Sequence, residues 1–289
     1  MTKPSATDRA VRDRYGAAAK ERESALCCAV SYDPRHLEAI PQEVIDRDYG
    51  CGDPSRFIRK GETVLDLGSG GGKICFIASQ LVGPEGAVLG VDTNDEMLAL
   101  ARRSTTEVAE RVGHANVTFL RGQIEDLALD HDKLDTWLAR HPIQSASDLP
   151  RFEEEKDRLR RGEPMVKDHS VDIVVSNCVL NLVHQALKPQ LIEGIFRVVK
   201  PGGRIAISDI VSDRIVPDEL RADPELWSGC VSGAFHEPEL IRQLERVGFR
   251  SIELDRAEGD PFAVVEGIEF RSVTFTAVKP GNETSSGCC

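Results

Sequence analysis

Apolar and amphipathic stretches alternate along the chain from Gly61 onward. The apolar runs TVLDL, AVLGV, VTFL, VDIVVSN and RIAISDI are separated by stretches in which apolar residues recur at helical spacing. Nearly continuous Val, Ile and Leu within the central runs is typical of parallel strands that are buried on both faces. The pattern therefore predicts an α/β, doubly wound fold with a mostly parallel sheet.

The helices and the last strands of this pattern can be placed approximately, and a turn is expected at KPGG. Closing strands are expected near 251–254 and 270–278. One expected helix ends near Val82. Three others cover Asp95 to Arg111, Gln190 to Val199 and Pro238 to Val247.

Three segments fall outside this pattern. Residues 1–60 form an N-terminal extension, residues 130–168 form a charged, helical insertion, and GNETSSGCC belongs to a polar tail over 280–289. The expected organisation is therefore one domain over 61–279 that carries the extension, the insertion and the tail.

The charge balance narrows the class of partner. The 289 residues include 36 Lys and Arg against 48 Asp and Glu, and the formal net charge is −12. A negative chain repels phosphate backbones and anionic lipids, which argues against nucleic acid and membrane partners and favours a small-molecule substrate. No segment approaches the roughly 20 apolar residues of a membrane span. The N-terminus lacks an apolar signal core, so a cytoplasmic location is expected.

The number of cysteines would suggest disulfides in a small secreted protein. A large cytoplasmic protein keeps its thiols mostly reduced, so they indicate redox or metal chemistry rather than a disulfide framework. The sequence has no CxxC pair and no Cys/His cluster at zinc-finger spacing. The eight cysteines are Cys27, Cys28, Cys51, Cys75, Cys178, Cys230, Cys288 and Cys289.

A glycine-rich sequence, DLGSGGG, lies between the first strand and the first helix. Gly68, Gly70 and Gly72 allow the backbone to approach a ligand there. The second strand ends at Asp92, which is placed to accept hydrogen bonds from ribose hydroxyls. The acidic pair in GQIEDL, which begins at Glu125 after the third strand, suits an adenine edge.

With Asp66 ahead of the glycines, these features resemble the class I S-adenosylmethionine methyltransferases. The resemblance implies a Rossmann-like, seven-stranded sheet and S-adenosylmethionine as cofactor. A nicotinamide cofactor is the competing interpretation, although its usual GxGxxG differs from GSGGG, and glycines serving only a tight turn would leave the acids unexplained. The implied cofactor contacts are Asp66, Gly68, Ser69, Gly70, Asp92, Thr93, Met97, Ile124, Glu125 and Asn177.

Two cysteines lie where open α/β sheets place substrate chemistry. Cys178 follows the fourth strand in VVSNCVLNLV, and Cys230, in LWSGCVSGAF after the fifth strand, can reach the same edge. Taken singly, each is typical of a buried, inert hydrophobic residue.

Four cysteine motifs, taken in order, resemble those of the arsenite methyltransferase family. They are YGCGDP around Cys51, GGGKIC with Cys75, SNCVLNLV with Cys178 and ELWSGCVSGAF with Cys230, and the resemblance covers about Tyr15 to Leu254. It implies that Cys178 and Cys230 bind trivalent arsenic as substrate. It also implies that Cys51 and Cys75 are the third-ligand and relay pair, which cycles through a disulfide. Glutathione or thioredoxin would be the thiol reductant.

The chemistry of arsenic agrees with this interpretation. Trivalent arsenic is soft, so thiolates bind it well and displace hydroxide from it. Its lone pair then points away from the sulfurs, and methyl transfer needs alignment and exclusion of water more than a general base. No His–carboxylate pair stands out in the sequence, and His184, after NCVLNL, is typical of a solvated loop histidine.

Two departures from the family and two alternatives stay open. The insertion interrupts a usually short link, and family members commonly continue into a further C-terminal domain. The alternatives are a methyltransferase acting on carbon or oxygen of a small organic molecule and a non-catalytic metalloid-binding protein. The Cys27–Cys28 and Cys288–Cys289 pairs resemble accessory arsenic-capturing thiols or reflect neutral drift.

Overall fold

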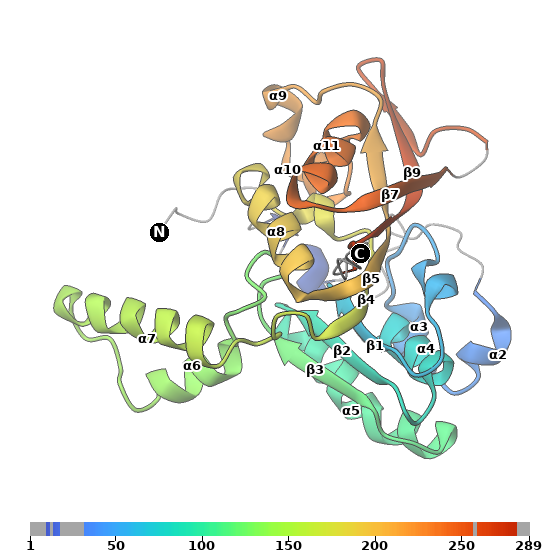
Figure 1. The fold of residues 1–289 in the computed structure, drawn as a ribbon. Coiled ribbons are helices and arrows are strands. Elements are labelled where there is room, and N and C mark those ends of the chain that lie inside the picture. The colour runs from blue at the N-terminus through green and yellow to red at the C-terminus, as the bar shows by residue number, and fades with distance from the viewer. Residues whose placement is uncertain (1–9, 12–13, 18–31, 257–258, 282–289) are drawn as a thin grey trace, which may run out of the picture.

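A central twisted sheet organises the molecule (Figure 1). The computed structural model describes residues 10–11, 14–17, 32–256 and 259–281. The main strand order is β3-β2-β1-β4-β5-β9-β7. The first five strands of this order run parallel, and β9 runs antiparallel to both of its neighbours. The strands are β1 Thr63–Leu67, β2 Ala87–Asp92, β3 Val117–Arg121, β4 Val171–Asn177, β5 Val199–Ser212, β6 Phe235–His236, β7 Arg250–Arg256, β8 Ala263–Val265 and β9 Ile268–Val278.

Helices cover both faces of this sheet. Buried side chains of α4 and α5 form one apolar cluster, and those of α8 and α11 form another on the opposite face. The helices are α2 Pro34–Leu37, α3 Gln42–Asp46, α4 Lys73–Val82, α5 Asp95–Val112, α6 His131–Leu138, α7 Leu149–Gly162, α8 Lys188–Val198, α9 Asp218–Arg221, α10 Pro224–Ser228 and α11 Glu237–Val247. Single 3₁₀ turns are η2 Pro54–Phe57, η3 Ala146–Asp148, η4 Leu180–Leu182 and η5 Gln185–Leu187.

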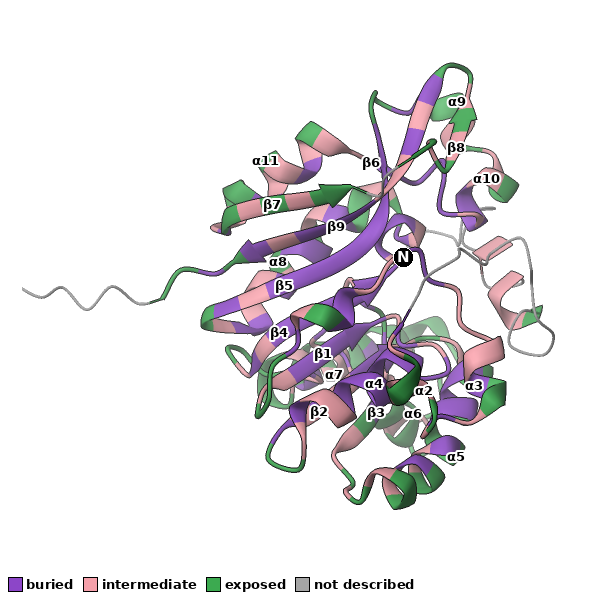
Figure 2. Ribbon diagram, turned by 90° about the vertical axis from the view of Figure 1, so that its right-hand side faces the viewer, coloured by how far each residue is buried: buried purple, intermediate pink, exposed green. Residues whose placement is uncertain are grey.

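The central strands are apolar because both of their faces are covered. In β1, Val64 faces the cluster of α4 and α5, whereas Leu65 and Leu67 face the cluster of α8 and α11. Figure 2 shows the middle of the sheet buried, while the edge strand β7 is mostly exposed or half-buried. The predicted doubly wound α/β class and mostly parallel sheet are confirmed.

Two details of the sheet differ from the expectation. The KPGG sequence lies inside β5, which begins at Val199, and the extra residues are absorbed by a register shift opposite Val171 and Ile173 of β4. The short strands β6 and β8 also pair with β5 and β9. Strands of two or three residues have too little alternation to be recognised from sequence.

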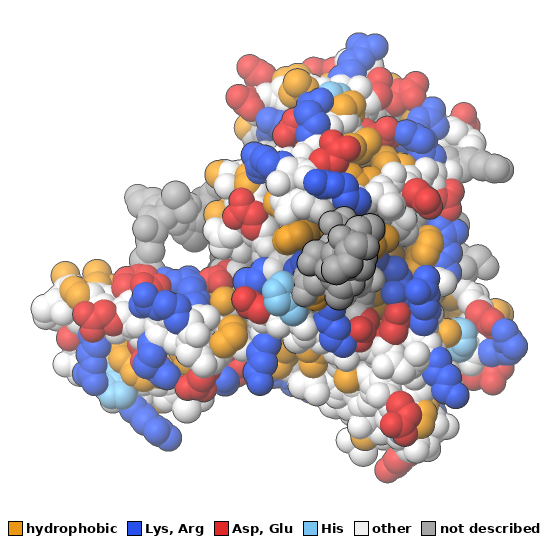
Figure 3. Space-filling view, in the orientation of Figure 1, with side chains coloured by type: hydrophobic (Ala, Val, Ile, Leu, Met, Phe, Trp, Pro, Cys, Tyr) orange, Lys and Arg blue, Asp and Glu red, His pale blue; other side chains and the backbone are white. Residues whose placement is uncertain are grey.

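The charged insertion forms a helical hairpin of α6 and α7 that projects from the molecule (Figure 1). Lysines, arginines and acidic side chains are intermixed on its surface in Figure 3. Leu134, Phe152 and Leu159 of the hairpin form a small apolar cluster with Leu129, separate from the main core. The last part of the predicted insertion is different, because Val166 is 1% exposed within the main core. The boundary at residue 168 was therefore wrong, and the projecting unit ends before Val166.

Removal of the hairpin alone should leave a folded protein. Lys133 and Glu163 form an ion pair at 3.2 Å, so the two ends of the hairpin lie side by side and a short Gly/Ser linker can replace 131–162. Deletion of 130–168 also removes Val166 and should cost a further ~1–3 kcal/mol of unfolding free energy. Urea unfolding of both deletions checks this, and a hairpin deletion that fails to fold would place α6 and α7 in the core.

The described part of the N-terminal extension packs against the domain rather than apart from it. Tyr32, Ile40, Val44 and Ile58 are buried in the same cluster as α4 and α5. Cys27, Cys28 and the Cys288–Cys289 pair lie outside the described residues. Within the part of the chain that the structure describes, no helix is both long enough and apolar enough to cross a bilayer.

Candidate active site

The loops that follow the carboxyl ends of β1, β2, β4 and β5 meet at one edge of the sheet. Parallel strands direct their carboxyl ends to the same side, which is where open α/β sheets bind ligands. The glycine loop follows β1, and the Cys178 turn follows β4. A Cβ at Gly68 would lie 2.4 Å from Val179 Cγ1, so this glycine allows the two loops to pack directly together.

The glycine loop has the backbone of a ligand cradle. Gly68, Gly70 and Gly72 all have positive φ, and Gly72 caps the N-terminus of α4. A Cβ at Gly72 would lie 2.7 Å from Phe119, whereas open space surrounds the Cβ direction of Gly70. Ser69 Oγ is buried and has no hydrogen-bond partner among the described residues. A buried polar atom without a partner beside open space is the arrangement expected where a polar ligand binds.

Asp92 joins the glycine loop to the end of β2. Its Oδ2 accepts a hydrogen bond from Gly70 N at 2.8 Å, and its Oδ1 accepts one from Asn94 N at 2.8 Å. Each carboxylate oxygen can accept a second hydrogen bond, so these contacts leave capacity for ribose hydroxyls. Asp92 therefore positions the loop and can also contact a ligand.

The other predicted cofactor residues differ in their surroundings. Met97 is buried in the first turn of α5, Thr93 is exposed before it, and Ile124 is buried after β3. Glu125 is half-buried, and its carbonyl accepts a hydrogen bond from Gln190. The second acid of GQIEDL, Asp126, pairs instead with Arg160 of α7 at 2.8 Å. The carboxylate of Asp126 therefore binds a side chain of the insertion.

Asp66 and Cys75 form a buried pair beneath the glycine loop. Asp66 is 2% exposed, and Cys75 Sγ donates to its Oδ2 at 3.3 Å. Burial raises the pKa of Asp66 to about 8, the carboxylates of Asp48 and Asp92 add to the rise, and the Cys75 hydrogen bond opposes it. Burial and the neighbouring Asp66 also raise the pKa of the Cys75 thiol.

The raised pKa of Asp66 predicts a specific pH dependence of stability. The folded protein holds the Asp66 proton between about pH 4 and 8, where the unfolded chain has released it. Stability should therefore fall as pH rises through this window, by up to about 1.4 kcal/mol per pH unit from this group. Asp66→Asn should remove that slope. Urea unfolding at pH 5, 6 and 7 checks it, and parallel pH profiles for both proteins would contradict the assignment.

The Gly50–Cys51–Gly52 loop is fixed by Asn177 at the end of β4. Asn177 Oδ1 accepts hydrogen bonds from Cys51 N at 2.9 Å and Gly52 N at 3.2 Å, and its Nδ2 donates to Gly52 O at 2.7 Å. A Cβ at Gly50 would lie 2.2 Å from Asn177 Nδ2, so any larger residue there would have to displace the Asn177 amide. The amide of Asn177 therefore holds Cys51 in place, which differs from the predicted cofactor contact.

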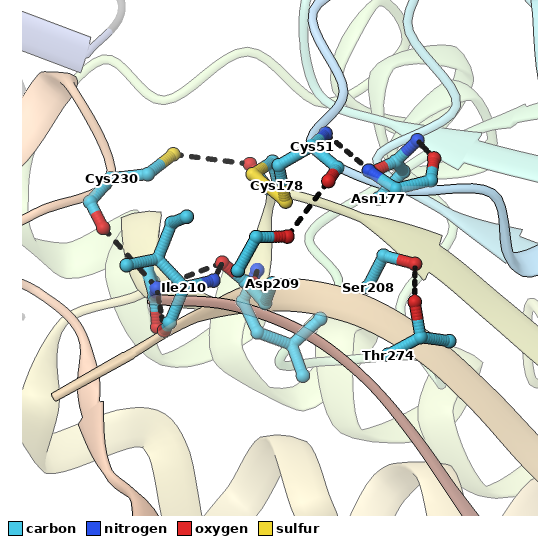
Figure 4. Close-up of a disulfide and its surroundings, with 12 residues drawn as sticks. Cys51, Asn177, Cys178, Ser208, Asp209, Ile210, Cys230 and Thr274 are labelled. Atoms are coloured by element: carbon cyan, nitrogen blue, oxygen red, sulfur yellow. Dashed lines mark hydrogen bonds between the residues drawn. A yellow bond between two sulfur atoms is a disulfide. The ribbon is translucent and has the colours of Figure 1, made fainter. Parts of the chain in front are cut away.

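Cys51 and Cys178 form a disulfide, with a Cα–Cα distance of 5.9 Å (Figure 4). The third cysteine, Cys230, donates from Sγ to the Cys178 carbonyl at 3.2 Å. Cys178 and Cys230 both have positive φ, 59° and 62°, which is uncommon for residues other than glycine. Such backbones persist only where their surroundings hold them, and they cluster at functional sites.

Three of the four motif cysteines therefore lie together. Cys51, Cys178 and Cys230 share an apolar cluster with Ile210 and Phe270. Cys75 lies in a different cluster, against Gly90 and Phe119. The bonded pair is Cys51–Cys178, whereas the resemblance implied Cys51–Cys75.

The disulfide also affects the expected ligand set. It uses two of the three sulfurs implied as arsenic ligands, and no group of three His, Cys, Asp or Glu side chains in the described ranges is arranged to hold a metal ion. The three expected ligands therefore lie close together, with Cys51 and Cys178 oxidised to a disulfide and Cys230 present as a thiol.

Tyr15 is a site residue that the sequence did not reveal. Its hydroxyl lies 3.7 Å from Cys230 Sγ, and burial together with the charge of a Cys230 thiolate raises the pKa of the phenol. Arg14 donates to Ser228 Oγ at 3.1 Å, which anchors the segment. The ring of Tyr15 also meets Tyr49 edge to face. Residues 14–17 therefore cover the Cys230 turn.

Comparison with known proteins places the chain in a family. Residues 58–163 and 154–248, together more than half of the chain, match the family model described as a methyltransferase domain. The chain belongs to this methyltransferase family. Its fold is that of the class I S-adenosylmethionine methyltransferases.

Individual relatives carry the name that the cysteine motifs suggested. An arsenite methyltransferase of Aquipseudomonas alcaligenes is 34% identical over 89% of this chain and 65% of its own length. The arsenite methyltransferase of Homo sapiens is 32% identical over 85% of this chain and 59% of its own length. These matches confirm the resemblance. The chain spans between half and two thirds of the length of the curated arsenite methyltransferases that it matches.

A solved structure shows the same architecture. The crystal structure of CrArsM, an arsenic (III) S-adenosylmethionine methyltransferase from Chlamydomonas reinhardtii, superposes with a TM-score of 0.66 at 28% identity. The superposition covers 86% of this chain and 74% of that chain. The similarity therefore extends over most of the methyltransferase described here.

Proposed function

We propose that this methyltransferase transfers a methyl group from S-adenosylmethionine to trivalent arsenic, as arsenite, methylarsenite or both, held by thiolates of the three-cysteine cluster. The observation that carries the proposal is the meeting of Cys51, Cys178 and Cys230 beside the glycine loop. Val179, the neighbour of Cys178, packs against Gly68 of that loop. The cysteine sulfurs that would bind the substrate and the glycine loop that would hold the cofactor therefore lie at the same edge of the sheet.

The residues around the glycine loop fit S-adenosylmethionine. Ser69 Oγ lacks a partner among the described residues, Gly70 faces open space, and Asp92 keeps acceptor capacity for ribose hydroxyls. Three further predicted contacts, Met97, Ile124 and Glu125, follow β2 and β3 at the same edge. When bound, S-adenosylmethionine would supply an electrophilic methyl group on its sulfonium.

The cysteine cluster supplies the rest of the chemistry. Thiolates of Cys178 and Cys230 bind soft arsenic and leave its lone pair directed away from the sulfurs. The apolar surroundings, with Ile210 and Phe270 fully buried, exclude water from the reacting atoms. Transfer would join the arsenic lone pair to the methyl carbon as the bond from that carbon to the sulfonium sulfur breaks and S-adenosylhomocysteine leaves. The residues of the chain therefore position and shield rather than remove a proton.

The oxidised pair supports the proposal of a thiol reductant. Cys51 and Cys178 cannot both bind arsenic while they are bonded to each other, so two electrons and two protons must be supplied first. Glutathione or thioredoxin is proposed as the donor. Reduction frees Cys178 for the ligand pair and Cys51 as the third ligand, while Cys75 would act as the relay after a shift of the first turn of α4.

Arsenite binding can be followed through Trp227, which is 3% exposed and whose carbonyl accepts a hydrogen bond from Cys230 N at 3.0 Å. Its Nε1 donates to Leu182 O at 3.3 Å. In a Trp137→Phe background, which leaves one tryptophan, arsenite should change the fluorescence of the reduced protein saturably. Neither the oxidised protein nor the Cys230→Ser variant should respond. A response that is equal with and without Cys230, or no response of the reduced protein, would overturn the proposal.

A further inference from the structure

A buried polar cluster lies directly beneath the cysteines, and the proposed chemistry does not use it. Asn181 is 0% exposed, Asp209 is 3% exposed and Lys188 is 1% exposed. Burial of three such side chains is costly unless hydrogen bonds satisfy them. Their contacts therefore indicate what they hold together.

The amide of Asn181 reaches three segments at once. Its Nδ2 donates to Asp209 Oδ1 at 2.8 Å, to Ile210 O at 2.7 Å and to Cys230 O at 3.2 Å. Asp209 and Ile210 lie in β5, and Cys230 lies in the turn after α10. In Figure 4, Asp209 and Ile210, which accept two of these hydrogen bonds, lie below the disulfide. One side chain thus ties the backbone of Cys230 to the central sheet.

The Cys178 turn is fixed to the same part of β5. Leu180 N donates to Asp209 Oδ2 at 2.9 Å, and Cys178 N donates to Ser208 O at 2.8 Å. Asp209 therefore accepts hydrogen bonds from the Cys178 turn through one oxygen and from Asn181 through the other.

The Cys230 turn also docks on the backbone of Asn181. A Cβ at Gly233 would lie 2.1 Å from Asn181 O, so only glycine allows this close approach. Lys188 Nζ donates to the Gly233 carbonyl from the other side. Both cysteine turns therefore rest on the same few atoms, and the positive φ of each cysteine has an external support.

We infer that Asn181, acting with Asp209, is a positioning residue that sets the separation and mutual orientation of the Cys178 and Cys230 side chains. Asn181 is fully buried, so it acts through the two turns rather than on a ligand. The statement that Cys178 and Cys230 are placed together in order to bind one arsenic atom rests on the proposed function. The geometric claim can be tested without arsenic.

The test uses a bifunctional bimane reagent that becomes fluorescent only after it has bridged two thiols. The background carries Cys27→Ser, Cys28→Ser, Cys51→Ser, Cys288→Ser and Cys289→Ser, which removes the vicinal pairs and frees Cys178. Cys75 is 0% exposed in its separate cluster, whereas Cys178 and Cys230 keep 7% and 4% of their surface exposed. The reagent should bridge Cys178 and Cys230, and the monofunctional bimane should label both.

Asn181→Leu, which keeps the side-chain volume but removes the donors, should reduce the bridging yield by about tenfold, while single labelling persists. Asn116→Leu is the matched control. Asn116 Nδ2 also donates to two carbonyls, of Gly83 and Gly86, but at the opposite edge of the sheet. The control should keep the full bridging yield. The affinity for S-adenosylmethionine should stay unchanged in both variants.

Gly233→Ala provides a second variant if Asn181→Leu does not fold. Its methyl group displaces the Cys230 turn without removing a hydrogen-bonding group from Asn181, and it should lower the bridging yield in the same way. Full bridging in a folded Asn181→Leu or Gly233→Ala protein would overturn the inference. A lower bridging yield in the variants would support the positioning role even if the unsubstituted, reduced protein does not bind arsenite. In that case only the proposed function would be refuted.

Discussion

Serine in place of Cys178 or Cys230 is expected to abolish methylation of both arsenite and methylarsenite. Each change replaces a soft sulfur ligand with a hard oxygen that binds arsenic poorly. Both residues lie in the same apolar cluster, beside the glycine loop. Each would supply one of the two sulfur ligands, so neither can take over the role of the other. The loss of activity should exceed the roughly 10–100-fold loss that is typical when a residue that only supports a metal ligand is replaced. Calorimetry should show that S-adenosylmethionine still binds.

Serine at Cys51 or Cys75 should be more selective. Arsenite has three exchangeable positions and methylarsenite has two, so a site with two thiolates can still present the methylated substrate. Cys51→Ser and Cys75→Ser should therefore lose activity on arsenite and retain part of it on methylarsenite, as measured by the methylated products of each substrate. Equal activity of all four serine variants on both substrates would return these cysteines to a packing role and favour an organic substrate.

Asp92→Ala should weaken S-adenosylmethionine binding by about 1–3 kcal/mol, or roughly 5–150-fold in Kd. The change removes the acceptor for ribose hydroxyls and also releases Gly70 N, whose hydrogen bond shapes the glycine loop. Asp126→Ala is a matched control, because that carboxylate pairs with Arg160 of the insertion. Calorimetry on both variants checks the assignment. An unchanged affinity of Asp92→Ala would remove Asp92 from the cofactor site.

The sequence was sufficient to predict the sheet and the edge that carries the site. β1 and β4 were recognised because continuous apolar runs are typical of strands covered on both faces. The position of Cys178 directly after β4, and of Cys230 in a loop after β5, then placed both at the carboxyl edge. Their proximity follows from topology and needed no structure.

The partners of these residues could not be predicted in the same way. The Cys51–Cys178 bond joins residues 127 apart, and Tyr15 meets Cys230 across a separation of 215 residues. Such contacts depend on how irregular loops pack, and a local pattern of apolar residues carries no information about them. Asn181 lies within the quoted NCVLNLV motif, but its contacts with β5 and the Cys230 turn appear only once the loops are placed.

The position of Cys75 was undetermined for a different reason. Nearly all residues in the first two turns of α4 are buried, so the helix has no single apolar face that would fix the direction of the thiol. The structure directs it toward Asp66 and Gly90. Its proposed relay role therefore predicts a movement of the first turn of α4 during the reaction.

Turnover tests the central claim most directly. The reduced chain is incubated with arsenite, a thiol reductant and S-adenosylmethionine that carries an isotopically labelled methyl group, and the arsenicals are separated and assayed for the label. The account predicts labelled methylarsenicals, formed only with the reductant and absent from the Cys178→Ser and Cys230→Ser variants. Saturable arsenite binding without any labelled arsenical would contradict it and identify a non-catalytic metalloid-binding protein.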